Sequence, residues 1–216
     1  RDLHSFPTRR SSDLVMAKKL FPDFKPYISM ALTPMVLTGR LIKKQKPDAK
    51  VVFIGPCAAK KLEASRKSVR SDVDFVLTFE EVMGMFEAKG INLPQVEADA
   101  PFEEGTANGR GFAVSGGVAN AVKQCIQKEH PDKEVLIDSA EGLKNCRTML
   151  MMAKAGKRNG YLLEGMACPG GCVAGAGTLQ PVIKSSALVK KYTNDAEKKL
   201  AFESEYLDNL DLLTKE

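Results

Sequence analysis

The chain lacks long hydrophobic runs and has few aromatic residues, and both shortages exclude classes of function. No apolar run approaches the roughly 20 residues that a membrane-spanning helix needs, so we expect no membrane partner. Aromatic residues make up 6% of the chain and rarely stand among the basic ones, which occur in scattered pairs such as Lys43-Lys44 and Lys190-Lys191. With a net charge of +5, this pattern is typical of a solvated surface, and we expect no nucleic-acid partner.

The overall composition is that of a folded domain. With 216 residues, 44% of them hydrophobic and 27% charged, the chain can bury a core as one domain or as two lobes, and it shows no internal repeat. Three of its five cysteines stand in contexts that suit metal ligands. Such cysteine usage favours a reducing compartment over a disulfide framework, which predicts a cytoplasmic location.

The most informative segment is Gly165-Met166-Ala167-Cys168-Pro169-Gly170-Gly171-Cys172, which follows a short apolar run. Proline fixes φ, and the two glycines allow the backbone to bend and to approach a bulky group without Cβ clashes. Both thiols can then face one centre, with peptide N–H groups available to its sulfur atoms, as an iron–sulfur cluster requires. The alternative is a glycine-rich turn with two small buried thiols.

A second segment, Pro56-Cys57-Ala58-Ala59-Lys60-Lys61-Leu62-Glu63, follows the apolar run Val51–Ile54. Helical spacing places Cys57, Lys60 and Glu63 on one flank, so that Glu63 can orient the lysine. A thiol near a helix N-terminus also ionises more easily, and the thiolate is the metal ligand. The alternative is a buried cysteine beside an ordinary surface ion pair.

The two remaining cysteines suit the core better than a metal site. Cys125 shares a helical apolar stripe with Val118, Ala121 and Val122, and Cys146 lies on a similar stripe. Neither is a good candidate for a further ligand.

Together the two cysteine segments resemble two of the three signature segments of the iron-only ([FeFe]) hydrogenase catalytic domain. The resemblance runs from about Val15 to about Pro181 and includes Ser115-Gly116-Gly117-Val118. It implies an α/β fold of two lobes with parallel sheets flanked by helices, and a cofactor cleft between the lobes. The implied reaction is the reversible reduction of protons, 2H⁺ + 2e⁻ ⇌ H₂.

The resemblance also implies roles for individual residues. Cys57 and Cys168 would be ligands of a [4Fe–4S] cluster, and Cys172 would bridge it to a diiron subsite that carries CO, CN⁻ and a dithiolate. Lys60, with Glu63 beside it, would donate to a cyanide ligand. The other implied site residues are a proton-relay serine, Ser29, and four that line the cofactor: Pro56, Ser115, Gly116 and Met166. The implied partners are a ferredoxin-like electron carrier and the proteins that mature the diiron site.

Departures from the common family pattern leave two other functions open. Gly55 stands where methionine is usual before Pro-Cys, and Val173–Pro181 differs from the usual glycine-rich continuation. Such departures resemble the monomeric or sensory branches of the family, which would make the chain an H₂-sensing module with little turnover. The third possibility is the related iron–sulfur assembly factor, against which the intact Met166–Cys172 segment argues.

The composition of the N-terminal residues predicts where the catalytic domain begins. A cubane cluster takes four thiolates, whereas the motifs supply three, and the family holds the fourth in an upstream Thr-Ser-Cys-Cys-Pro segment. Residues 1–14 contain no cysteine, are too polar for a signal peptide, and over His4–Leu14 read like a translated sequencing adapter; the alternative is a natural basic tail. We therefore expect a disordered, non-native leader over residues 1–14, a partial and inactive catalytic domain over 15–193, and a C-terminal helical tail over 194–216.

Strand and helix signals alternate along the chain, as in an α/β protein with ligands at the carboxyl ends of parallel strands. Helices are predicted to begin at Thr33-Pro34, at the capping box of Thr78 and Glu81, and at Ser139. The predicted strands are Val51–Ile54, Asp74–Leu77, Gly111–Val114, Val135–Ile137 and Tyr161–Leu163. The charged tail has a thin apolar face and either docks on the body or frays.

Overall fold

The strands form two small parallel sheets, each crossed over by a helix. The computed structural model describes residues 12–29, 31–65, 71–97 and 105–214. The paired strands are β1 (Val52–Ile54) with β2 (Phe75–Leu77), and β3 (Leu136–Glu141) with β4 (Tyr161–Met166). Helix α3 (Ala59–Ser65) joins the first pair, and α7 (Leu143–Lys154) joins the second. The prediction of an α/β fold with parallel sheets flanked by helices is therefore confirmed.

The first sheet belongs to a lobe built around helix α2 (Pro34–Gln45). As predicted, Thr33 is the N-cap of this helix and Pro34 its first residue. The apolar side of α2 packs against one face of the sheet, since a helix must bury its hydrophobic stripe against another element. The buried core of this lobe consists of Met35, Val36, Val51 and Val73.

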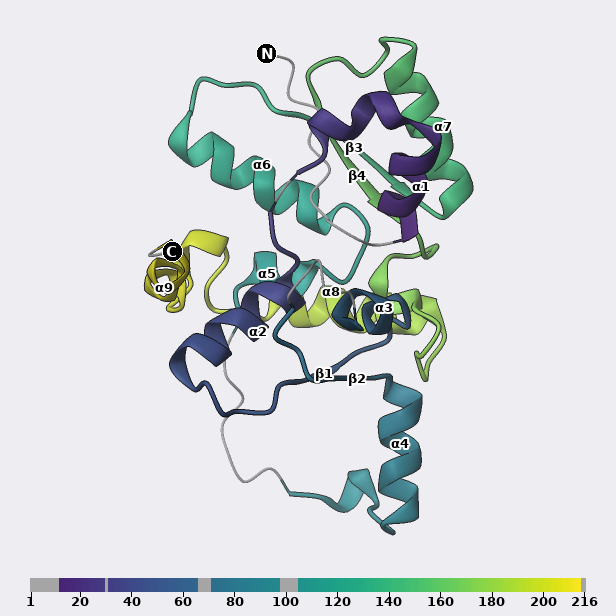
Figure 1. The fold of residues 1–216 in the computed structure, drawn as a ribbon, viewed down its shortest axis with the longest axis vertical. Coiled ribbons are helices and arrows are strands. Elements are labelled where there is room, and N and C mark those ends of the chain that lie inside the picture. Colours follow the sequence, from purple (N-terminus) through teal and green to yellow (C-terminus); the bar gives the residue numbers. More distant parts are fainter. Residues whose placement is uncertain (1–11, 30, 66–70, 98–104, 215–216) are drawn as a thin grey trace.

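Helix α4 (Phe79–Ala88) extends from the end of the first sheet (Figure 1). The predicted capping box is present, because Thr78 and Glu81 exchange hydrogen bonds between side chain and backbone. None of its residues is buried. A short 3₁₀ turn, η2 (Leu93–Gln95), follows α4.

The second sheet forms the core of the other lobe with α1 (Ser12–Leu20), η1 (Pro22–Tyr27) and α7 (Figure 1). Leu163, at 0% exposure, and Leu150, at 1%, are the largest apolar side chains at its centre. Cys146 is also only 1% exposed, which confirms that it belongs to the core. The predicted leader falls on residues 1–11, which lie outside the described residues, and on the first turn of α1.

Three helices lie between the two sheets in Figure 1 or flank the second one: α5 (Ala107–Gly111), α6 (Gly117–Glu129) and α8 (Val182–Asn194). Helix α6 packs on β3 and β4, and α5 contacts both α6 and α8. The sequence analysis did not predict α8, on which the apolar side chain of Ile183 is 87% accessible.

Two local predictions were wrong. Gly111–Val114 is not a strand, because Thr106 caps helix α5 by accepting from the Gly109 N–H, and the chain then turns twice before α6 begins. Ser139 does not begin a helix, because it lies within β3, opposite Glu164 of β4. Pairing with β4 extends β3 through polar residues that by themselves favour a cap, and α7 begins only at Leu143.

The C-terminal segment docks on the body through short turns rather than as one continuous helix. Its elements are η4 (Ala201–Glu203), η5 (Leu207–Leu210) and α9 (Asp211–Thr214). The first contacts α5 and α6, and α9 contacts α2. Across the part of the chain that the structure describes, no helix has the length and apolar character needed to traverse a bilayer.

Candidate metal centre

Cys57 lies in the turn between β1 and α3, at the carboxyl end of the first sheet. Gly55 still donates its N–H to Leu77 of the neighbouring strand at 3.1 Å, after which the chain leaves the sheet. The Lys60 N–H donates to the Cys57 carbonyl at 3.2 Å, so Cys57 stands immediately before the first helical turn. Helix α3 begins at Ala59, two residues after Cys57, and the Cys57 side chain is half-buried.

Lys60 and Glu63 form an ion pair, and Glu63 has a second partner. The Lys60 Nζ lies 2.7 Å from Glu63 Oε2, while the Thr33 hydroxyl donates to Glu63 Oε1 at 2.5 Å. Glu63 is 3% exposed, and Lys60 is 22% exposed. A buried carboxylate needs such partners, since burying an unpaired charge is costly. The spacing argument that Glu63 can orient Lys60 agrees with this geometry.

The second cysteine segment leaves the end of β4 in a tight turn. The Gly171 N–H donates to the Cys168 carbonyl at 3.0 Å, and Cys172 begins a 3₁₀ turn, η3 (Cys172–Ala174). Gly171 has φ +87°, and a Cβ there would lie 2.8 Å from the Ser115 nitrogen and 2.9 Å from the Ala113 oxygen. Glycine is therefore required for this backbone to pack against the turn before α6. Cys168 is half-buried and Cys172 is exposed.

The two cysteine turns touch each other through the backbone. The Gly177 N–H donates to the Pro56 carbonyl at 2.9 Å, and a Cβ on Gly175 would lie 2.2 Å from the same oxygen. On its other side the second turn contacts the segment Gly111–Val114, since the Val173 N–H donates to the Ala113 carbonyl at 3.1 Å. The structure thus brings together three predicted site segments, those of Pro56-Cys57, Ser115-Gly116 and Cys168–Cys172.

Glu164 is a residue of this site that the sequence analysis missed. It lies in β4, is 2% exposed, and accepts from the Gly116 N–H at 2.9 Å and the Ala119 N–H at 2.7 Å. Its carboxylate therefore satisfies the first N–H groups of α6 and interacts favourably with the positive end of the helix dipole. An acid inside the apolar run Tyr161–Met166 was the available signal, because a buried acid requires a partner.

The structure also describes two other predicted site residues, Met166 and Ser29. Met166 ends β4 and is 9% exposed, and its carbonyl accepts from the Gly142 N–H at 2.8 Å. The Ser29 hydroxyl oxygen accepts from the Ala31 N–H at 3.2 Å, just before α2. The roles of Ser29 in proton relay and of Met166 beside a diiron site stay predictions.

The donor set fits an iron–sulfur cluster in part. The cysteines of the converging turns offer three thiolates of the four that a cubane takes. Cys146 instead donates its S–H to the Ala140 carbonyl at 3.3 Å, and Cys125 is half-buried on α6. Within the described ranges no three His, Cys, Asp or Glu side chains are close enough to hold a single metal ion. A cubane spreads its thiolates over four iron atoms, so its ligands stand further apart than those of one ion.

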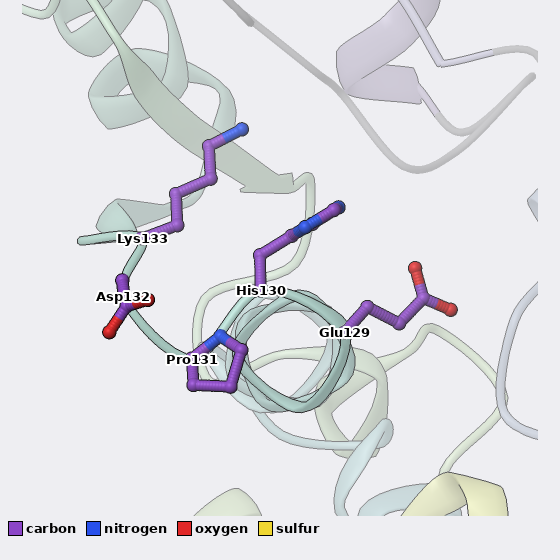
Figure 2. A pocket seen from close by; sticks show the side chains of 5 residues that line it. All are labelled: Glu129, His130, Pro131, Asp132 and Lys133. Atoms are coloured by element: carbon purple, nitrogen blue, oxygen red, sulfur yellow. The ribbon is translucent and has the colours of Figure 1, made fainter.

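Two surface hollows in the described part of the chain lie away from these cysteines. One is open to solvent at the end of α6, where Glu129, His130 and Lys133 do not converge on a common point (Figure 2). A second lies between η1 and the end of α7 and includes Asp23, Tyr27 and Lys154. Neither includes a predicted site residue.

Comparison with known families identifies the chain. The family model described as "Iron only hydrogenase large subunit, C-terminal domain" matches residues 12–176, and the chain belongs to this family.

The curated relatives include two kinds of protein. The chain is 30% identical to the periplasmic [Fe] hydrogenase large subunit of Nitratidesulfovibrio vulgaris, over 77% of this chain and 49% of the relative. It is 31% identical to the NADP-reducing hydrogenase subunit HndD of Solidesulfovibrio fructosivorans, over 83% and 38%. It is also 30% identical to the cytosolic iron-sulfur assembly component 3 of Pongo abelii, over 72% and 42%. The chain thus spans half or less of these three relatives' length.

Solved structures of [FeFe] hydrogenases share the fold. One, from work on oxygen inactivation, superposes with a TM-score of 0.70 at 21% identity, covering 96% of this chain and 70% of the other. A variant of HydA1 from Chlamydomonas reinhardtii gives 0.70 at 20% identity, covering 97% and 71%.

Proposed function

We propose that the chain forms part of an [FeFe]-hydrogenase catalytic domain that reduces protons to H₂ reversibly. The observation that carries this proposal is the backbone contact between the Pro56-Cys57 turn and the segment after Cys172. It places both cysteine turns at one locus beside the Lys60–Glu63 pair, within a chain of the hydrogenase family. When bound there, a [4Fe–4S] cluster joined to a diiron subsite with CO, CN⁻ and dithiolate ligands would supply the electron transfer and the hydrogen chemistry.

The chain's own residues would bind and orient that group. Cys57 and Cys168 would hold the cubane, and Cys172, which is exposed at the start of η3, would bridge to the diiron part. The Lys60 ammonium, fixed by Glu63, would donate a hydrogen bond to a cyanide ligand. Ser29 is proposed to pass protons, and Pro56, Ser115, Gly116 and Met166 to line the cofactor.

A second candidate function is iron–sulfur cluster assembly without diiron chemistry. It is favoured by the assembly factors among the relatives, whose identity to this chain is comparable to that of the hydrogenases. The complete Met166–Cys172 segment, which the hydrogenase resemblance requires, favours the hydrogenase. Sensing of H₂ with little turnover is a variant of the leading proposal.

The implied partners and compartment are part of the proposal. A ferredoxin-like carrier would exchange electrons with the cubane, and maturation proteins would deliver the diiron subsite. The names of the relatives include both periplasmic and cytosolic proteins. Three cysteines in ligand-like positions favour a reducing compartment, and we propose the cytoplasm.

Infrared spectroscopy of the full-length protein, matured by co-expression with diiron maturation proteins, tests the proposal. Bands from metal-bound CO and CN⁻ are expected for a hydrogenase or a sensor. A protein that binds iron and sulfide but lacks these bands would be an assembly factor instead. H₂ turnover with a dye acceptor then separates enzyme from sensor.

A further inference from the structure

Thr33 has a buried hydroxyl whose partner belongs to the candidate site. The side chain is 2% exposed, and its oxygen accepts from the Val36 N–H at 3.4 Å as the N-cap of α2. The same hydroxyl donates to Glu63 Oε1 at 2.5 Å, across 30 positions of sequence. An N-cap needs only the accepting role, so the donated bond requires a separate explanation.

We infer that Thr33 is a positioning residue that fixes the Lys60 ammonium through Glu63. The two oxygens of Glu63 are divided between two partners, since Oε1 accepts from Thr33 and Oε2 from Lys60 at 2.7 Å. A hydroxyl on one oxygen fixes the carboxylate plane, and the other oxygen then has one direction from which to hold the lysine. This inference rests on the proposed function, in which Lys60 contacts the cofactor.

The rigidity comes from the first lobe. Thr33 is anchored at the start of α2, whose first turn contains the buried Met35 and Val36. Lysine has a flexible four-carbon stem, so an ammonium held only by a solvated acid would sample many positions. The hydrogen bonds from Thr33 and Lys60 to Glu63 therefore fix the ammonium near Cys57 relative to the packed helix α2.

The chain contains a matched control for this inference. Thr78 is the N-cap of α4, is also buried, and stands beside a second pair, Lys61 and Glu81. Thr78→Val removes a helix cap of the same kind without touching Glu63. A role of Thr33 in capping alone predicts the same behaviour of Lys60 in both variants.

NMR relaxation of the lysine ammonium nitrogens, measured on the purified chain without metal, tests the positioning role. The Lys60 signal is assigned by its absence in Lys60→Arg. In Thr33→Val we expect the Lys60 order parameter to fall to that of the exposed Lys184, while Thr33→Ser and Thr78→Val keep the wild-type value. An unchanged value in Thr33→Val, or an equal fall in Thr78→Val, overturns the inference.

A measurement on the wild-type chain decides the case where Thr33→Val does not fold. The Thr33 hydroxyl proton is expected to be protected from exchange with water, and rapid exchange overturns the inference. Infrared spectra of matured protein separate this question from the proposed function. Absence of cyanide bands in the wild type sinks the proposed function, whereas the relaxation contrast at Lys60 still decides the role of Thr33.

Discussion

Two buried acids organise the candidate site at the level of single residues. Glu63 divides its oxygens between Thr33 and Lys60, and Glu164 divides its own between the Gly116 and Ala119 N–H groups. Each carboxylate joins segments distant in sequence. Removing one partner of a buried hydrogen-bonded acid lowers the free energy of unfolding by about 1–3 kcal/mol, so a substitution that removes a partner of either acid is expected to destabilise the fold.

Replacing cysteines one at a time tests the ligand assignment. We expect Cys172→Ala to abolish retention of the diiron subsite in matured protein, because Cys172 lies in the turn that meets Pro56-Cys57. Cys125→Ala is the control, since Cys125 lies on α6 outside the converging turns. Iron content and the infrared CO and CN⁻ bands report retention. Equal loss in both variants would overturn the assignment.

At the level of elements, the converging turns are held by backbone contacts that only glycine allows. A Cβ on Gly175 would lie 2.2 Å from the Pro56 oxygen, and one on Gly177 would lie 2.4 Å from the Thr78 Cβ. No side chain accommodates such distances by changing rotamer, because one partner in each contact is the main chain or a Cβ. The segment after Cys172 must therefore stay glycine-rich for the first lobe to approach it.

A pair of glycine substitutions separates this requirement from the ordinary effect of adding a methyl group. Gly175→Ala is expected to lower the free energy of unfolding by about 3 kcal/mol, because overpacking separates the two cysteine turns. Gly84→Ala, where a Cβ on α4 has open space, is expected to raise it by about 1 kcal/mol. Urea unfolding measures both. If Gly175→Ala lowered the free energy of unfolding by less than an ordinary surface substitution does, the close contact would be refuted.

The first lobe also carries an acid-sensitive connection. The Val51 N–H donates to Asp74, and Lys43 lies 3.1 Å away; the two together lower the pKa of Asp74 from its usual 3.8. Because the folded-state pKa is depressed, the stabilisation is complete above the ordinary pKa and is lost as the pH falls through the lowered value.

Substitution of Asp74 makes this contribution measurable. Urea unfolding of the wild type and of Asp74→Asn is compared at about pH 6 and about pH 3. The wild type is expected to be the more stable at the higher pH, with the difference shrinking in acid. Other carboxylates with lowered pKa values, such as Glu81, are common to both proteins and cancel. A difference that does not change with pH would contradict the role of Asp74.

At the level of the whole molecule, the C-terminal segment links parts that belong to different lobes. The Ala201 N–H donates to Asn108 Oδ1 at 2.9 Å, and the Lys128 ammonium stands 3.4 Å from the centre of the Phe202 ring. Further along, α9 contacts α2 of the first lobe. Of the two sequence-based alternatives for the tail, docking is the one observed.

Loss of the Asn108 side chain should release this segment selectively. In Asn108→Ala we expect faster amide hydrogen exchange over residues 195–214, with little change in the two sheets, because only the bonds to Ala201 and Gln124 are lost. Asn145→Ala, on α7, removes an exposed amide whose hydrogen bond is local. Exchange that rises equally in both variants, or not at all in Asn108→Ala, would show that the segment is held by other contacts.

Elements with strong local signals could be predicted from the sequence. The Thr33-Pro34 start of α2, the Thr78 and Glu81 capping box and the apolar strands of the first sheet depend on residues within a few positions of each other. Elements that depend on pairing could not, as the extent of β3 past Ser139 shows. The docked tail is a further case, since its contacts are with α5, α6 and α2.

For the candidate site, the sequence predicts the chemistry, because the kinds and spacing of Cys57, Lys60, Cys168 and Cys172 are local features that indicate an iron–sulfur ligand set. The contacts that hold these residues in place are visible only in the folded structure. Contacts such as Thr33 to Glu63, Glu164 to Gly116 and Gly177 to Pro56 join positions far apart in the chain. No local pattern encodes them, because each forms only when elements far apart in the sequence have packed against each other.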